Sequence, residues 1–130
     1  MAEGSLRASA PGESGALRLV SGQVVFGDTT VEIDELEVGD VVIQAWVQVT
    51  TAFNAGTTNV LTLGDGNTAD KYLAAADVTE GTPGVYPTGG KGPYAAETVA
   101  RTLTATYAQT GTAATTGAAR VYALISSVPE

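Results

Sequence analysis

Hydrophobic and polar residues alternate along much of the chain, most clearly over residues 40–63. A long alternating run ends in a Gly-containing turn at residues 54–58, and a second alternating run follows at residues 59–63. A period of two residues is typical of a β-strand whose two faces meet different surroundings. The segment therefore predicts a β-hairpin with one packed face and one polar face.

We expect one side of the long strand to face the core, and its members are Ile43, Ala45, Val47, Val49, Thr51 and Phe53. The opposite side is more polar and consists of Val42, Gln44, Trp46, Gln48 and Thr50. A Trp between two Gln suits a subunit interface or a second, partly buried layer, because such a ring has one wet end. Packing of Trp46 under a loop is the alternative interpretation.

Strands are also predicted at both ends of the chain. Residues 16–33 read as short strands, and Gly27-Asp28 looks like a two-residue hairpin turn. Residues 98–107 and 118–126 predict a second hairpin. In its first strand, apolar residues oppose a ladder of threonines, namely Thr98, Thr102, Thr104 and Thr106. In its second strand, Val121, Ala123 and Ile125 oppose Arg120, Tyr122 and Leu124.

The middle of the chain has a weaker pattern. Residues 64–67 predict a sharp turn, and residues 72–76 suit either one helical turn or an edge strand. Residues 79–93 are rich in Gly and Pro and predict a long surface loop of the kind that is usually functional or mobile. The pattern as a whole predicts an all-β protein, a single small β-sandwich or barrel of seven or eight antiparallel strands. Residues 1–15 are predicted to be a flexible N-terminal arm, and residues 16–130 the β-sandwich domain.

Composition bears on size, charge and partners. The chain has 130 residues with only 1 Trp, 2 Phe and 5 Tyr, so we expect partner subunits to supply part of its buried area. Its 14 acidic and 6 basic residues give a net charge of −8, which argues against nucleic-acid or anionic-membrane partners. The absence of Cys excludes disulfides and thiolate metal sites. No apolar run approaches the length of a membrane span, and no secretory signal is visible.

Candidate chemistry is sparse. Without His, no Ser-His or Cys-His arrangement exists. The carboxylates of one short acidic segment are better explained as a solvated turn, and they are Glu32, Asp34, Glu35 and Glu37. Asp65, Asn67 and Asp70 faintly resemble calcium ligands, but turn formation explains them without a metal. The Gly-rich segments lack the spacing of phosphate-binding loops. The residues therefore predict no enzyme activity and neither a cofactor nor a metal site.

Two segments carry a family resemblance. Residues 50–78 (TTAFNAGTTNVLTLGDGNTADKYLAAADV) and 103–125 (LTATYAQTGTAATTGAARVYALI) resemble small virion structural proteins of tailed bacteriophages, including head decoration (cement) proteins. The resemblance implies a non-enzymatic capsid decoration protein that stabilises the outer head shell. It implies the major capsid protein as partner, a location on the capsid surface of the virion, and a homotrimer.

Partner-contact residues follow from the arm, the predicted loop and the aromatic residues. We expect capsid contact from the arm and first strand through Leu6, Leu17 and Leu19, and from the loop through Tyr86, Lys91 and Tyr94. Buried packing or subunit contact is expected at Trp46, Tyr107 and Tyr122. The alternative is a tail or fibre module that recognises a host glycan or protein, with Tyr86 and Tyr94 as stacking surfaces. A carboxylate-dependent glycan hydrolase is a third hypothesis.

Overall fold

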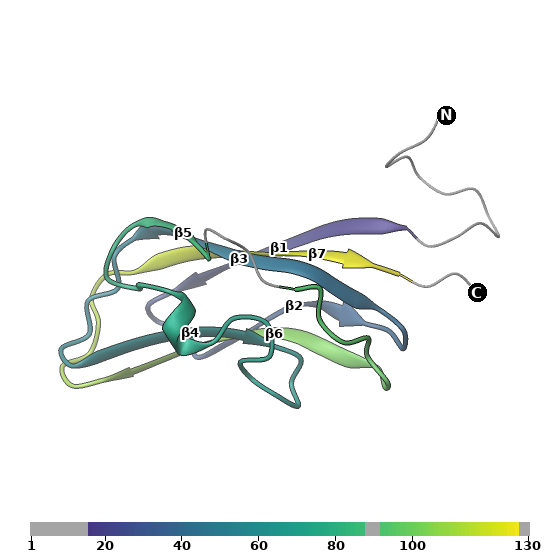
Figure 1. The fold of residues 1–130 in the computed structure, drawn as a ribbon. Coiled ribbons are helices and arrows are strands. Elements are labelled where there is room, and N and C mark those ends of the chain that lie inside the picture. The colour runs from purple at the N-terminus through teal and green to yellow at the C-terminus, as the bar shows by residue number, and fades with distance from the viewer. Residues whose placement is uncertain (1–15, 88–91, 128–130) are drawn as a thin grey trace.

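Seven strands and a short 3-10 helix form the regular structure of residues 16–87 and 92–127, which the computed structural model describes (Figure 1). The strands are β1 (Leu17–Val25), β2 (Thr30–Leu36), β3 (Val41–Thr51), β4 (Thr58–Gly64), β5 (Gly84–Tyr86), β6 (Arg101–Thr110) and β7 (Ala118–Ser126). The helix η1 covers Ala75–Asp77. This all-β sandwich confirms the predicted fold class.

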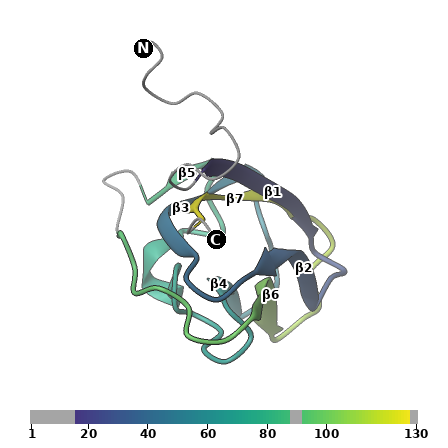
Figure 2. The same cartoon turned by 90° about the vertical axis from the view of Figure 1, so that its right-hand side faces the viewer.

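Consecutive strands always lie in different sheets. The order β1-β7-β3-β5 makes a four-stranded sheet, here called sheet A, and β2-β6-β4 makes a three-stranded sheet B. Each paired strand runs antiparallel to its partner. The end-on view in Figure 2 shows the two sheets facing each other across the core.

The predicted hairpins are therefore wrong. The strands on either side of Gly27-Asp28, those over residues 40–63 and those of the C-terminal pair all run to opposite sheets. Alternation of apolar and polar residues indicates that a strand has one buried and one open face, but it does not indicate which strand lies beside it. The connection after β3 is held from another loop, because the Asn54 side chain accepts the amides of Thr115 (2.8 Å) and Thr116 (3.0 Å).

The predicted core face of β3 is confirmed at Ala45, Val47 and Val49 and is corrected at its two ends. Register shifts against β7 occur between Val42 and Gln44 and again between Val49 and Thr51. A bulge inserts one residue and so exchanges the faces of the residues on either side of it. Val42 therefore joins the buried residues, Ile43 is only partly buried, and Thr51 is exposed.

The core lies between the sheets and is built mainly from aliphatic side chains. The largest that are fully buried are Tyr72, Leu36, Leu61, Leu63, Leu73, Leu103 and Ile125. Glycines permit two close approaches. A Cβ on Gly22 would lie 2.5 Å from Ile33 of β2, and one on Gly117, where φ is +146°, would lie 2.2 Å from the Phe53 ring. Any larger residue at either position has to displace core packing.

The segment after β4 covers the edge of sheet B. Leu63 and Leu73 form an isolated bridge, and the Leu61 amide donates to the Glu80 carboxylate over 2.9 Å. The predicted long loop at residues 79–93 contains a strand, since β5 pairs with β3 through Tyr86 opposite Val47. The sequence did not indicate this three-residue strand, because the Gly and Pro residues around it interrupt any alternation of apolar and polar residues.

Candidate interaction surface

The two outer faces of the sandwich differ in chemistry. Across sheet B, the register places Thr30, Thr106 and Thr62 in one row and Glu32 beside Thr104 in the next. Hydroxyl and carboxylate side chains on a strand suit a solvated face. Of the threonine ladder that the sequence predicts, Thr102, Thr104 and Thr106 lie on β6, whereas Thr98 precedes this strand.

Across sheet A, the outer face carries large apolar groups. One row joins Leu19, Leu124 and Gln44, and the next joins Ser21, Tyr122 and Trp46. The Trp46 and Tyr122 rings are stacked, with centroids 5.4 Å apart and planes 12° from parallel. Three large apolar side chains of this sheet are open to solvent, namely Leu17 (42% exposed), Leu19 (57%) and Val85 (45%).

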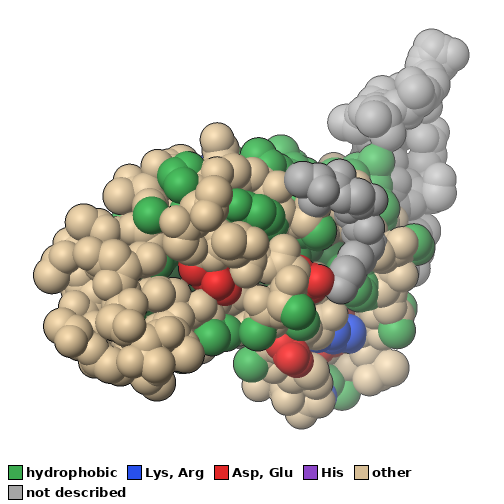
Figure 3. All heavy atoms as spheres, turned by 60° about the vertical axis from the view of Figure 1, so that its left-hand side comes forward, with side chains coloured by type: hydrophobic (Ala, Val, Ile, Leu, Met, Phe, Trp, Pro, Cys, Tyr) green, Lys and Arg blue, Asp and Glu red, His purple; other side chains and the backbone are tan. Residues whose placement is uncertain are grey.

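Sheet A also lacks acidic residues. None of its four strands, all of them described, contains Asp or Glu, although the whole chain carries 14 acidic residues. Of its two arginines, Arg18 points between the sheets and only Arg120 lies on the outer side, where it contacts Ser21. In Figure 3, the upper side of the molecule shows hydrophobic side chains, and the visible acidic and basic ones lie lower. We call this outer side of β1, β7, β3 and β5 the sheet A face.

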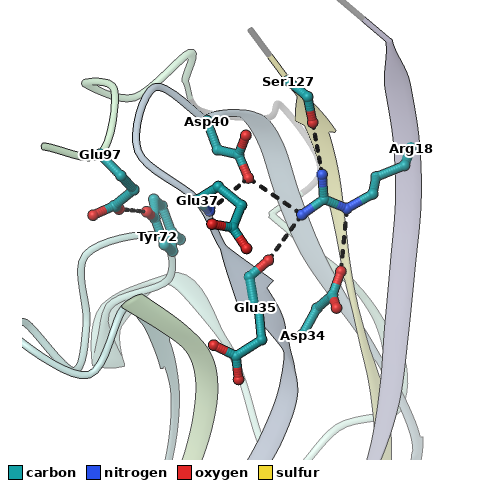
Figure 4. A network of polar contacts seen from close by, with 8 residues as sticks. All are labelled: Arg18, Asp34, Glu35, Glu37, Asp40, Tyr72, Glu97 and Ser127. Atoms are coloured by element: carbon teal, nitrogen blue, oxygen red, sulfur yellow. Dashed lines mark hydrogen bonds and ion pairs between the residues drawn. The ribbon is translucent and has the colours of Figure 1, made fainter. Parts of the chain in front are cut away.

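Arg18 ties the beginning of β1 to sheet B (Figure 4). Its guanidinium pairs with Asp34 (3.2 Å) and with Asp40 (3.3 Å). It also donates to the Ser127 hydroxyl (2.7 Å) and the Glu35 carbonyl (2.9 Å). Asp40 is only 3% exposed and accepts the Glu37 amide as well, so Arg18 supplies the charge that its buried carboxylate needs.

A second polar cluster surrounds Lys71. Its ammonium pairs with Glu97 (3.0 Å) and Asp65 (3.3 Å), and the Tyr72 hydroxyl donates to Glu97 over 2.5 Å. Burial alone would raise the pKa of Asp65, but hydrogen bonds from Thr68 and Lys71 outweigh it and hold that pKa below its ordinary value. Burial, followed by the hydrogen bond to Glu97 and then by the Glu97 charge, raises the pKa of Tyr72. The cluster fixes the loop after β4 against the segment before β6.

Glu80 is a buried carboxylate with a structural partner. It is 8% exposed, and burial raises its pKa while the Leu61 amide opposes that shift. Its carbonyl accepts the Phe53 amide over 3.0 Å. Glu80 thus ties β4 to the end of β3.

The structure brings only some of the predicted partner-contact residues together. Leu17, Leu19 and Trp46 share the sheet A face. Tyr86 packs against the core and donates to the Thr82 carbonyl (2.7 Å), while Tyr94 stacks edge-on with Tyr72 and donates to its carbonyl (2.8 Å). Leu6 and Lys91 lie outside the described residues.

Sequence reasoning did not select Val85 and Leu124 as contact residues. Val85 sits in a strand that its Gly and Pro neighbours hid, and Leu124 fitted the alternation without any sign of which face was outer.

Two of the other residues predicted for packing or subunit contact are also placed. Tyr122 stacks on Trp46 at the sheet A face. Tyr107 is buried, which is one of the two roles predicted for it, and its ring centroid lies 4.7 Å from that of Phe53 while its hydroxyl donates to Asn59 over 2.6 Å.

Two of the acidic side chains weighed as catalytic or calcium-binding, Asp34 and Asp65, have structural partners. Asp34 holds Arg18, and Asp65 accepts the amides of Asn67 and Thr68 in addition to Lys71. Within the described residues, no group of three or more His, Cys, Asp or Glu is placed to hold a metal ion. In the same part of the chain, no helix has the length and apolar character to cross a membrane.

Comparison with solved structures finds the same fold in two bacteriophage capsids. A chain of the cyanophage Pam1 capsid asymmetric unit matches with a TM-score of 0.65 and 21% identity, over 98% of this chain and 96% of that one. A chain of the acidic stable capsid of Helicobacter pylori bacteriophage KHP30 matches with a TM-score of 0.66 and 14% identity, over 88% and 89%. At such identities the likeness shows a shared fold. No family model and no curated protein matches the sequence.

Proposed function

We propose that this chain is a non-enzymatic structural protein of a bacteriophage particle, and that within it the chain is a decoration (cement) protein on the outer surface of the head. The observation that carries the proposal is the pair of matches to chains of phage capsids, each of which covers at least 88% of both chains. Because nearly all of both chains aligns in the cyanophage match, the capsid contains a separate chain of about this size and fold.

The chemistry of the described residues supports an adhesive role. The two charge clusters around Arg18 and Lys71 hold structural elements together, and the sheet A face presents apolar and aromatic surface. The proposed partner is the major capsid protein, and the proposed assembly is a homotrimer. Many copies on a shell gain strength through multivalency, so each contact can be weak.

Shell binding is tested with purified heads that lack this chain. The full chain is added in excess, the heads are pelleted, and the bound copies per head are counted against a parallel sample of isolated tails. The proposal expects saturable binding to heads at a copy number that matches sites on an icosahedral lattice. Binding to tails alone, or to neither particle, would overturn it.

The predicted contact of the N-terminal arm is tested by deleting residues 1–15. We expect the thermal midpoint of the shortened chain to stay within a few degrees of the parent, because the core begins at β1. We expect its binding to heads to weaken by about tenfold or more, which corresponds to ~1.4 kcal/mol. Unchanged occupancy on heads would remove the arm from the contact surface.

A further inference from the structure

We infer that the sheet A face is the surface through which copies of this chain associate with one another. This inference names the contact surface of the proposed trimer and rests on that part of the proposed function. Its basis is the contrast between the two sides of one sandwich. The sheet A face carries a stacked Trp46–Tyr122 pair and open leucines, while the opposite face carries threonines and Glu32. Aromatic enrichment with few charges is typical of the centre of a protein interface.

The charge distribution favours a second copy of this chain as the partner that covers the sheet A face. Each chain has a net charge of −8, so two copies repel one another across most of their surfaces. The strands of sheet A contain no acidic residue, and Arg120 is the outward-facing charge on them. The sheet A face is therefore where one acidic molecule can approach another with the least repulsion.

The size of the face is adequate. β1, β7 and β3 contain 9, 9 and 11 residues. With strands about 4.8 Å apart and a rise of about 3.4 Å per residue, they offer a face about 30 Å long and about 15 Å wide, which β5 extends at one end. A standard interface removes roughly 800 Å² of accessible surface from each partner. The pleated face with its projecting side chains provides much of that area.

The chain contains a natural probe of this surface, because Trp46 is its single Trp. The full chain is diluted from about 100 µM to about 0.1 µM while mass is measured by light scattering and Trp46 is quenched with acrylamide. We expect the mass to fall and the quenching to rise over the same concentration range. Association should also tighten between about 10 mM and about 300 mM salt, because screening shortens the reach of the repulsion between two acidic chains.

Two matched substitutions localise the contact. Leu19→Glu places a charge at a 57% exposed position on the sheet A face, and Val99→Glu places the same charge at a 45% exposed position outside the strands of sheet A. We expect Leu19→Glu to weaken association at least 30-fold, roughly, because an unpaired carboxylate would be buried at the contact. Val99→Glu should change it by less than about threefold.

A thiol-protection experiment keeps the test valid if Leu19→Glu fails to fold. The chain has no Cys, so Ser21→Cys on the sheet A face and Thr106→Cys on sheet B each introduce the single thiol of the molecule. Maleimide should label Ser21→Cys more slowly as protein concentration rises, and should label Thr106→Cys at a constant rate.

The outcomes separate this inference from the proposed function. A chain that is monomeric at about 100 µM would overturn the inference even if it binds heads. So would an oligomer in which Trp46 and the thiol of Ser21→Cys are as accessible as they are in the monomer. The inference would likewise be overturned if the chain is monomeric in solution and Trp46 becomes protected from quenching only when the chain binds heads. In that case the sheet A face contacts the shell. Self-association through this face by a chain that binds no head would uphold the inference and refute the decoration role.

Discussion

Replacing Arg18 with Met should be among the more destabilising single changes at a partly exposed position. Arg18 has 34% of its side chain exposed, and the two carboxylates it pairs with differ in burial, since Asp34 is 36% exposed and Asp40 only 3%. A half-exposed pair such as Arg18–Asp34 contributes about 0.2–1 kcal/mol. A buried carboxylate that loses its partner costs about 3–5 kcal/mol, which the remaining Glu37 amide reduces.

The expected loss for Arg18→Met is therefore about 2–4 kcal/mol in the free energy of unfolding. For a chain of this length, that corresponds to a fall of about 6–15 °C in the thermal midpoint. Urea unfolding followed by Trp46 fluorescence measures the free energy directly, and Asp34→Asn serves as the comparison with an expected cost below about 1 kcal/mol.

The double variant Arg18→Met/Asp40→Asn tests whether the unpaired Asp40 carboxylate causes the loss of stability in Arg18→Met. Removing the Asp40 charge relieves the buried carboxylate, so the double variant should be more stable than Arg18→Met alone. If the double variant is less stable, or if Arg18→Met costs under about 1 kcal/mol, Arg18 does not compensate a buried charge and its role has been misassigned.

Two further changes test the core and the buried acid. Gly117→Ala should lower the free energy of unfolding by about 2–5 kcal/mol, because φ at Gly117 is +146° and the new Cβ would meet the Phe53 ring. Gly27→Ala is the control, because no atom lies near its new Cβ, and it should change the free energy by less than about 0.5 kcal/mol. Urea unfolding measures both. Glu80 has its pKa raised by burial, so its ionisation favours unfolding as pH rises through that raised value. Glu80→Gln should therefore raise the thermal midpoint at pH 7 and match the parent below about pH 4, where Glu80 is protonated in both states. A lower midpoint at pH 7 for Glu80→Gln would contradict this account.

The sequence predicted the strands well because alternation is a local property. Six of the seven strands fall on segments that the alternation marked, and β5 was hidden by its Gly and Pro neighbours. Pairing was predicted wrongly because it depends on distant partners, such as β1 with β7. The bulge between Val42 and Gln44 changed which residues at the start of β3 face the core, and no residue type in that run indicates a bulge.

The interaction surface could be predicted only in part. The position of Trp46 between glutamines indicated a second, half-buried layer, and its stacking on Tyr122 confirms that it does not lie on the core side. At the start of β1, however, the pattern did not say which side of the strand was inner. The leucines face outward and Arg18 faces inward, because Val20 and Val24 on the same side as Arg18 pack into the core. The cluster of Lys71 with Glu97 joins residues 26 positions apart and leaves no local signal.

The alternation of strands between the two sheets governs how this chain reaches its native state. Among the described strands, none pairs with the one just before or after it, so a hairpin of consecutive strands cannot nucleate folding. β7 lies between β1 and β3, so these three strands of sheet A come together only once β7 has been synthesised. Such non-local pairing places folding in the range of about milliseconds to seconds. It also means that each connection between consecutive strands crosses from one layer to the other, so a change in any connection affects both sheets.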